Sequence, residues 1–231
     1  MVGVFCIFYR DFLKKCLDID MPNVINLYFI EKTLWKVESP QKTPQVKSNN
    51  FKEVWREMVP VEAMLGYVLL LVGFVFFCNG MTVLGKTGAK EVGVLNFAVG
   101  VLILIAAWQL HGLGLSAATA LVSVFALIYF MVAGIFIHGY DAKGLGWYCL
   151  FATIVFVWYG YFFHELGLLY FALFCWAWAL LVFLCFLVFS LGKAVAPAVA
   201  WLFIIEAFLT LLIPGMLLLT DKWNPLGGVP G

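Results

Sequence analysis

The chain has 231 residues, of which 65% are hydrophobic and 12% are charged, and its mean hydropathy is +1.02. A soluble domain averages about half apolar and about a quarter charged residues, so this composition favours a membrane protein over a soluble one. The net charge of +1 gives no indication of a nucleic acid or another strongly acidic partner.

The charged residues are concentrated at the start of the chain. Residues 1–63 contain nine Lys or Arg and eight Asp or Glu, whereas residues 64–231 contain five of each. The first residues are not typical of a signal peptide, because charges follow a short apolar run and no small-residue cleavage site is present. We expect residues 1–63 to be an upstream translation artefact or a dispensable extension, and residues 224–231 to be a C-terminal tail. The mass of the intact protein tests this, and a mature chain beginning at Met1 would contradict it.

Six apolar runs follow Ala63, and each has about the length that crosses a membrane as a helix, since about 20 helical residues span a roughly 30 Å hydrocarbon core. The runs are 64–84, 92–110, 116–137, 147–163, 166–190 and 198–219. Runs one, three and five begin about 50 residues apart and each is followed by a shorter partner. The sequence therefore predicts an all-α integral membrane protein whose six transmembrane helices form three repeated helical hairpins within residues 64–223.

The lysines of the connecting loops indicate an orientation. Lys86 and Lys90 lie in the first loop, Lys143 in the third and Lys193 in the fifth, whereas the second and fourth loops contain no Lys or Arg. Because basic loops remain cytoplasmic, the odd loops are expected inside the cell. The N- and C-terminal ends of the six-helix bundle are then expected outside.

Glu206 is the acidic residue within a predicted span. A charge at the centre of a transmembrane helix costs about 2.5–3.5 kcal/mol on insertion scales, so such a residue faces the bundle interior or a water-filled path. Two interpretations stay open: a neutral glutamate that makes one interhelical hydrogen bond, or a carboxyl that lines a solute pathway. Both direct the side chain inwards.

Other polar and aromatic residues of the spans are weaker candidates. Trp176 and Trp178 are two residues apart and point to different sides of one helix, so at most one shares the interior with Glu206. Asn96 and Asn79 either line the pathway or make an interhelical hydrogen bond, which contributes about 0.6–2 kcal/mol.

Small residues and cysteines have a structural interpretation. Gly66 and Gly73, and likewise Gly93 and Gly100, are seven residues apart on one helix face, which predicts close helix packing. The six cysteines contain no CxxC pair, and four of them lie in apolar runs, which is typical of small buried apolar side chains. We expect no metal site.

Histidines are few and lie outside the apolar runs. His111 and His164 fall in loops predicted to face outwards, and His164 with Glu165 is an outward pair that can titrate near neutral pH. These residues are either a solvated surface or an outer pH-sensitive site.

No constellation for catalysis is present. The sequence contains no nucleophile elbow, no zinc-protease motif and no phosphate-binding glycine loop, so we expect no catalytic residues and no cofactor. Arg56 is the last arginine of the sequence, which argues against anionic substrates within the spans. One carboxyl, some amides and many aromatic rings suit a small, neutral, planar molecule with N–H donors, such as urea or a short amide.

Several stretches carry a resemblance to a known family. They are MLGYVLLLVGFVFFCNG at 64–80, VLNFAVG at 94–100, GWYCLF at 146–151, CWAWALL at 175–181 and WLFIIEAFLTLLIPGMLLL at 201–219. Over residues of about 64–223 the chain resembles the urea/amide channel family, the UreI and AmiS proteins. The last stretch is the most specific, because a Trp five residues before the Glu and a following Ile-Pro match the family's final span.

The resemblance implies a homo-hexamer in the inner membrane, in which each six-helix protomer contains its own pore. It implies that Glu206 is the pore glutamate and Trp178 a pore tryptophan. On the first span it implies narrow apolar pore positions, which follow an i, i+4, i+7 pattern on one helix face: Leu65, Leu69, Val72 and Phe76. The outward loops are short and hold few titratable groups, so steep acid gating is not expected.

These features predict a passive channel, and not an enzyme, for urea or short-chain aliphatic amides such as acetamide, feeding a cytoplasmic urease or amidase. One alternative is a proton-coupled carrier of small neutral amides, in which Glu206 loads and releases a proton in each cycle. Another is a structural membrane subunit without a pore.

Overall fold

The computed structural model describes residues 61–223 and residue 225, which belong to one compact unit, Val59–Gly231. Residues 61–63 form the start of the first described helix, so this helix begins three residues before the predicted boundary at Met64. The rest of the predicted extension and, except for residue 225, of the predicted tail lie outside the described residues.

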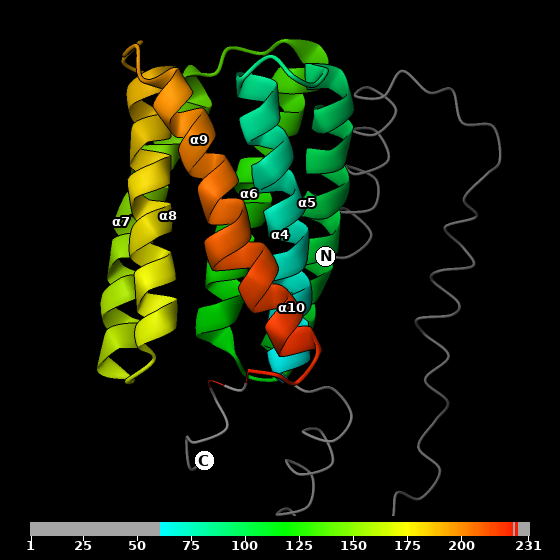
Figure 1. The fold of residues 1–231 in the computed structure, drawn as a ribbon, viewed down its shortest axis with the longest axis vertical. Coiled ribbons are helices and arrows are strands. Elements are labelled where there is room, and N and C mark those ends of the chain that lie inside the picture. Colours follow the sequence, from blue (N-terminus) through cyan, green and yellow to red (C-terminus); the bar gives the residue numbers. More distant parts are fainter. Residues whose placement is uncertain (1–60, 224, 226–231) are drawn as a thin grey trace, which may run out of the picture. The chain divides into compact units, whose positions relative to one another are not determined.

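Six membrane-length apolar spans make up the described part of the chain (Figure 1), as the sequence predicts. The first five are single α-helices: α4 (Val61–Val83), α5 (Ala89–Gly112), α6 (Ser116–His138), α7 (Lys143–Glu165) and α8 (Leu169–Phe189). The sixth consists of α9 (Ala196–Glu206), the π-helical segment η1 (Ala207–Leu212) and α10 (Ile213–Leu219). No strand occurs among the described residues, so the all-α fold class is confirmed. The predicted ends differ from the observed ones by a few residues, most of all in α7.

The spans are apolar on all sides, and only part of each is buried within the bundle. Between 33% and 50% of the most apolar window of each span is buried. Large apolar side chains such as Trp108 and Trp158 are exposed on the outside. A helix that is apolar all round fits a surrounding of hydrocarbon, and the chain is a multi-pass membrane protein.

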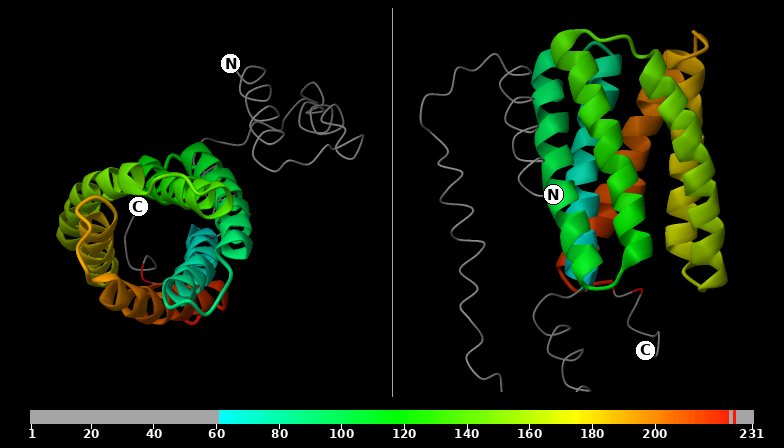
Figure 2. Two further views of the ribbon diagram at one scale, coloured as in Figure 1. Left: turned by 90° about the horizontal axis from the view of Figure 1, so that it is seen from above. Right: turned by 180° about the vertical axis from the view of Figure 1, so that it is seen from behind.

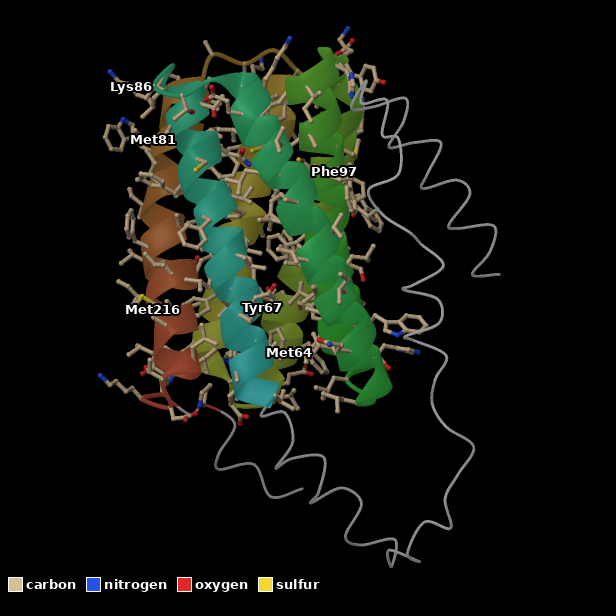
Figure 3. All side chains as sticks on the ribbon, turned by 90° about the vertical axis from the view of Figure 1, so that its right-hand side faces the viewer. Met64, Tyr67, Met81, Lys86, Phe97 and Met216 are labelled. Carbon is tan, nitrogen blue, oxygen red and sulfur yellow. The ribbon has the colours of Figure 1, made fainter. Side chains whose placement is uncertain are left out.

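Short loops alternate between two ends of the bundle. We call the end with loops 84–88, 139–142 and 190–195 the lysine end, and the end with loops 113–115 and 166–168 the histidine end. Figure 3 shows Lys86 at the lysine end of α4 and Met64 towards its other end. Each loop contains one glycine with a left-handed φ, which reverses the chain after a helix: Gly85, Gly114, Gly139, Gly167 and Gly192.

The six spans run alternately up and down, so that spans one and two, three and four, and five and six form the predicted hairpins. The closest packing, however, is between helices of different hairpins. α5 packs along α6, α7 along α8, and α4 along the whole sixth span. Small residues permit this closeness, as the glycine spacing predicts. A Cβ on Gly66 would lie 2.9 Å from the carbonyl oxygen of Gly215, and one on Gly93 would lie 2.8 Å from Ile137. These three close pairs form a ring around the bundle axis (Figure 2).

The sixth span changes its helical geometry directly after Glu206. η1 starts at Ala207, and Pro214 follows in the first turn of α10. A proline lacks the N–H that would bond the carbonyl four residues earlier, so it disturbs the regular α-helical pattern on its N-terminal side. Single π-helical turns are frequent at functional sites, and this one lies between Glu206, the last residue of α9, and α10.

Candidate solute pathway

Two cavities lie inside the ring, one at each end. The wide cavity, of about 260 Å³, opens between the histidine-end halves of α4, α6, α7 and α8, with Leu211 of η1. The narrow cavity, of about 60 Å³, lies between the lysine-end halves of the same helices, with Phe203 of α9. No residue of α5 lines either cavity. Both cavities are lined by Phe125 of α6, so they meet at this residue.

Phe125 is the centre of an aromatic partition between the cavities. Its ring centroid is 4.9 Å from that of Phe156 on α7, 5.1 Å from that of Trp178 on α8 and 6.2 Å from that of Phe76 on α4. Rings from four helices thus converge at one level of the bundle. Phe125 and Phe156 are almost completely buried, so the partition closes the passage between the cavities in this conformation.

The predicted pathway residues of the first span lie along this route. Leu65, Leu69 and Val72 line the wide cavity, and Phe76 lines the narrow one. The level at which the wide cavity ends therefore falls between Val72 and Phe76 on α4.

Trp178 and Trp176 point to different surroundings, as their spacing predicts. Trp178 is buried and lines the wide cavity, and its indole N–H donates a 2.9 Å hydrogen bond to Thr210 Oγ1. The indole of Trp176 instead packs against Gly160 of α7, where a Cβ would collide with it. Of the two, Trp178 is the one that faces the bundle interior.

Glu206 is buried in the bundle, with 3% of its surface exposed. Neither carboxylate oxygen has a hydrogen-bond partner among the described residues, and the side chain lines neither cavity. Neither of the two interpretations describes this arrangement directly, because within the described part of the chain the carboxyl makes no interhelical hydrogen bond and does not belong to the lining of either cavity.

The neighbours of Glu206 fix its level in the bundle. It lies close enough to Cys185 of α8 for an electrostatic interaction, and Cys185 lines the narrow cavity. One turn further on, the hydroxyl of Thr210 contacts Trp178, which lines the wide cavity, and donates a 2.8 Å hydrogen bond to the carbonyl oxygen of Glu206. Glu206 is therefore placed between the two cavities, at about the level of the partition.

The two asparagines pair with each other. Asn79 Nδ2 donates to Asn96 Oδ1 at 3.2 Å, and Asn96 Nδ2 donates to Asn79 Oδ1 at 2.8 Å. Asn96 also donates to the carbonyl oxygen of Val92 at 2.8 Å. Asn79 lines the narrow cavity, but its amide is engaged in the reciprocal pair, which supports an interhelical role for both residues.

The histidine candidates lie outside the cavities. His111 and His164 are exposed, with ring centroids 6.3 Å from Trp108 and 6.1 Å from Trp176, and Glu165 is exposed as well. Within the described residues, no three His, Cys, Asp or Glu side chains are grouped so that they could hold a metal ion.

Comparison with known proteins shows the family of the chain. Residues 64–222 match the family described as AmiS/UreI family transporters. The chain belongs to the AmiS/UreI family. The resemblance predicted from the span sequences is thereby confirmed, and the family consists of transporters and channels rather than enzymes.

Relatives and solved structures carry both branches of the family name. The chain is 30% identical over 183 residues to an amidate substrates transporter protein of Mycolicibacterium smegmatis, covering 70% of this chain and 79% of that one. It is 29% identical over 196 residues to the acid-activated urea channel of Helicobacter pylori, covering 69% of this chain and 100% of that one. The crystal structure of the H. pylori urea channel matches with a TM-score of 0.64 at 29% identity, covering 69% of this chain and 99% of that one. Its closed-state cryoEM structure matches with a TM-score of 0.61 at 30% identity, covering 69% and 100%.

The structure adds three residues to the candidate pathway that the sequence interpretation missed. Phe125 is one of 23 phenylalanines, and nothing in its neighbourhood distinguishes it. Thr210 is found only through its bond to Trp178. Tyr129 lines the narrow cavity with a buried hydroxyl that has no partner among the described residues. A hydroxyl in the middle of an apolar span was a signal that could have identified Tyr129.

Proposed function

We propose that the chain is a passive channel through which urea or short-chain aliphatic amides cross the inner membrane down their gradient to a cytoplasmic urease or amidase. One observation carries the proposal: two cavities reach inwards from opposite ends and meet at an aromatic partition, at whose level Glu206 is buried with an unpaired carboxyl. The names of the relatives, an amidate transporter and a urea channel, support the solute class.

The apolar lining accounts for the exclusion of ions. An ion that entered the wide cavity would exchange its hydration shell for hydrocarbon, and this transfer costs far more than the transfer of a neutral amide. A cavity of about 260 Å³ accommodates a small amide and some water, since a water takes up about 30 Å³ in the liquid. At the partition the solute must lose that water, and the rings of Phe125 and Trp178 then flank its planar faces.

Glu206 supplies the polar partner at the level where water is lost. A carboxylate is an acceptor only, and an amide or urea molecule brings N–H donors. The indole N–H of Trp178 is already bonded to Thr210, so Trp178 offers its ring and not its donor to the solute. Passage requires the Phe125 ring to turn aside, because it closes the route between the cavities.

Liposome swelling with urea and acetamide tests the assigned lining. Glu206→Gln and Trp178→Ala are expected to reduce flux of both solutes while the protein still assembles. Trp108→Ala is a matched control, because Trp108 lies on α5, which lines neither cavity, and is 77% exposed. Unchanged flux in both pathway variants rejects the lining.

The unpaired carboxyl also supports a second candidate, the proton-coupled carrier. A buried Glu206 without a partner could take up a proton from one cavity and release it to the other. A pH gradient across the vesicle then drives accumulation of the amide above its outside concentration. If the amide only reaches equal concentrations on both sides of the membrane, the carrier is excluded and the passive channel stands.

We also propose the setting of the channel. The lysine end faces the cytoplasm, and the N- and C-terminal ends of the six-helix bundle lie outside. Residues 64–223 suffice for flux, and the protein assembles as a homo-hexamer surrounded by lipid. The basic loops support the first point, and the family resemblance supports the last. Amine labelling of sealed cells, flux through a chain that starts at Met64, and the mass of the detergent-solubilised particle measure these points separately.

A further inference from the structure

Two cysteines stand side by side in the wall of the narrow cavity. Cys149 of α7 and Cys185 of α8 are buried, both line this cavity, and their thiols are close enough for an electrostatic interaction. The helices that carry them are closely packed, since a Cβ on Gly146 would lie 2.8 Å from the backbone nitrogen of Ser190. All four cysteines of the described residues are free thiols. The fold thus brings together two thiols that are 36 positions apart in the sequence.

The surroundings of the pair select the kind of ligand. Thiolates are soft ligands and prefer soft cations. Zinc takes four protein ligands in structural sites, and the described residues offer no group of three or more potential ligands here. Two thiols alone suit a cation that is satisfied by two ligands in line, and Hg²⁺ is such a cation.

Charge balance also favours a divalent soft cation. Binding replaces two S–H bonds by two S–Hg bonds and releases two protons, so that Hg²⁺ + 2 RSH gives RS–Hg–SR + 2 H⁺ without any change of oxidation state. The product is neutral. A monovalent cation such as Ag⁺ would leave a net negative charge in an apolar wall, near Glu206, and a buried unpaired charge is costly.

We propose that Cys149 and Cys185 form a two-thiolate site for Hg²⁺ in the wall of the narrow cavity, and that the bound cation closes the pathway. The cation reaches the pair from the lysine end, where Val83, which also lines the cavity, is 39% exposed. A cavity of about 60 Å³ leaves little room for a solute beside a bound ion. The binding stands independently, and only the block of flux rests on the proposed function.

A titration of the full-length protein tests the binding. The starting variant carries Cys6→Ser, Cys16→Ser, Cys78→Ala and Cys175→Ala, so that the pair alone remains. With HgCl₂ we expect one mercury and two released protons per chain, with the ultraviolet charge-transfer absorption of mercury thiolates. Because two linked ligands act as a chelate, Cys149→Ala or Cys185→Ala should lower the affinity on the order of 100-fold.

Controls separate the pair from single thiols and from misfolding. Restoring Cys175 to a variant without the pair gives a single cavity-lining thiol, which should bind with the weak affinity of one ligand. If the alanine variants do not assemble, Cys149→Ser and Cys185→Ser keep a small hydrogen-bonding group and replace them. Two mercury ions per chain, or an affinity that does not change when one cysteine is removed, overturns the proposal.

Vesicle flux tests the block. In the starting variant HgCl₂ should reduce acetamide flux at least fivefold, and an added dithiol should restore it. In the Cys185→Ala variant, acetamide flux should be the same with and without this concentration of HgCl₂. Tight binding without loss of flux refutes the block but keeps the site. If no protein-mediated flux is found at all, the proposed function fails, and the titration alone decides the site.

Discussion

Two places inside the bundle hold polar side chains, and they differ in how these are satisfied. Asn79 and Asn96 exchange two hydrogen bonds, and Asn96 makes a third with the backbone of its own helix. Glu206 is equally buried, yet both of its carboxylate oxygens lack a partner among the described residues. In a membrane, each polar group without a partner costs free energy that the fold must supply elsewhere.

The difference separates a structural polar pair from a functional polar group. The asparagines join α4 to α5, the helix that lines neither cavity. Glu206 makes its bundle less stable than an apolar residue would, and a solute with N–H donors is the partner that would satisfy it. This contrast predicts opposite effects of the same substitution at the two places.

Replacing Glu206 by leucine should have the largest effect on flux and none that harms the fold. Hydrogen bonds to a carboxylate contribute about 1.5–3 kcal/mol, which corresponds to a loss of flux of roughly tenfold or more. Burial of an unpaired polar group costs about 1–3 kcal/mol, so Glu206→Leu should raise the thermal unfolding temperature in detergent. A variant that loses both flux and stability would show that Glu206 is structural.

Replacing Asn96 by leucine should have the reverse effect. It leaves the amide of Asn79 buried without partners, which should lower the free energy of unfolding by about 1–2 kcal/mol. Flux per correctly assembled protein should change little. In a double-mutant cycle, Asn79→Leu together with Asn96→Leu should lose less stability than the sum of the single variants, because no amide is left unpaired. Additive losses would contradict the reciprocal pair.

The sequence predicted the fold well because the membrane restricts the possibilities. Long apolar runs have no alternative to helices, and short loops fix their alternating directions, so six spans follow from hydropathy alone. Glu206 was recognised for the same reason, since a carboxyl within a span is rare. Packing partners are different: nothing in CWAWALL states which tryptophan meets Thr210, and nothing links Cys149 to Cys185. The π-helical segment after Glu206 and the partition at Phe125 depend on how neighbouring helices fit together.

Thr210 is a polar residue close to Glu206, and we expect it to affect flux through the orientation of Trp178. Thr210→Val has nearly the same shape but removes the acceptor for the indole N–H, so the ring is no longer held in place. A net hydrogen bond contributes about 0.5–1.5 kcal/mol, so acetamide flux should change roughly threefold, and water flux should change less. Thr210→Ser keeps the hydroxyl and should restore the parent protein's ratio of acetamide flux to water flux. Equal effects of valine and serine would mean that Thr210 matters only for packing.

The smallest effect is expected at the histidine end. Its loops 113–115 and 166–168 contain only leucine and glycine, and the side chains of His111, His164 and Glu165 are exposed and line no cavity. Surface substitutions change free energies by about 0.5 kcal/mol, so His111→Ala and His164→Ala should each alter flux by roughly twofold or less. The two variants should also keep the parent protein's ratio of flux between pH 5 and pH 7.5, because a solvated imidazole is far from the partition. A relative is named an acid-activated urea channel, so this ratio is informative. If His164→Ala abolishes a pH dependence of flux in the parent protein, the histidine end acts on the partition from a distance. An exposed histidine would then belong to the functional polar groups together with the buried Glu206.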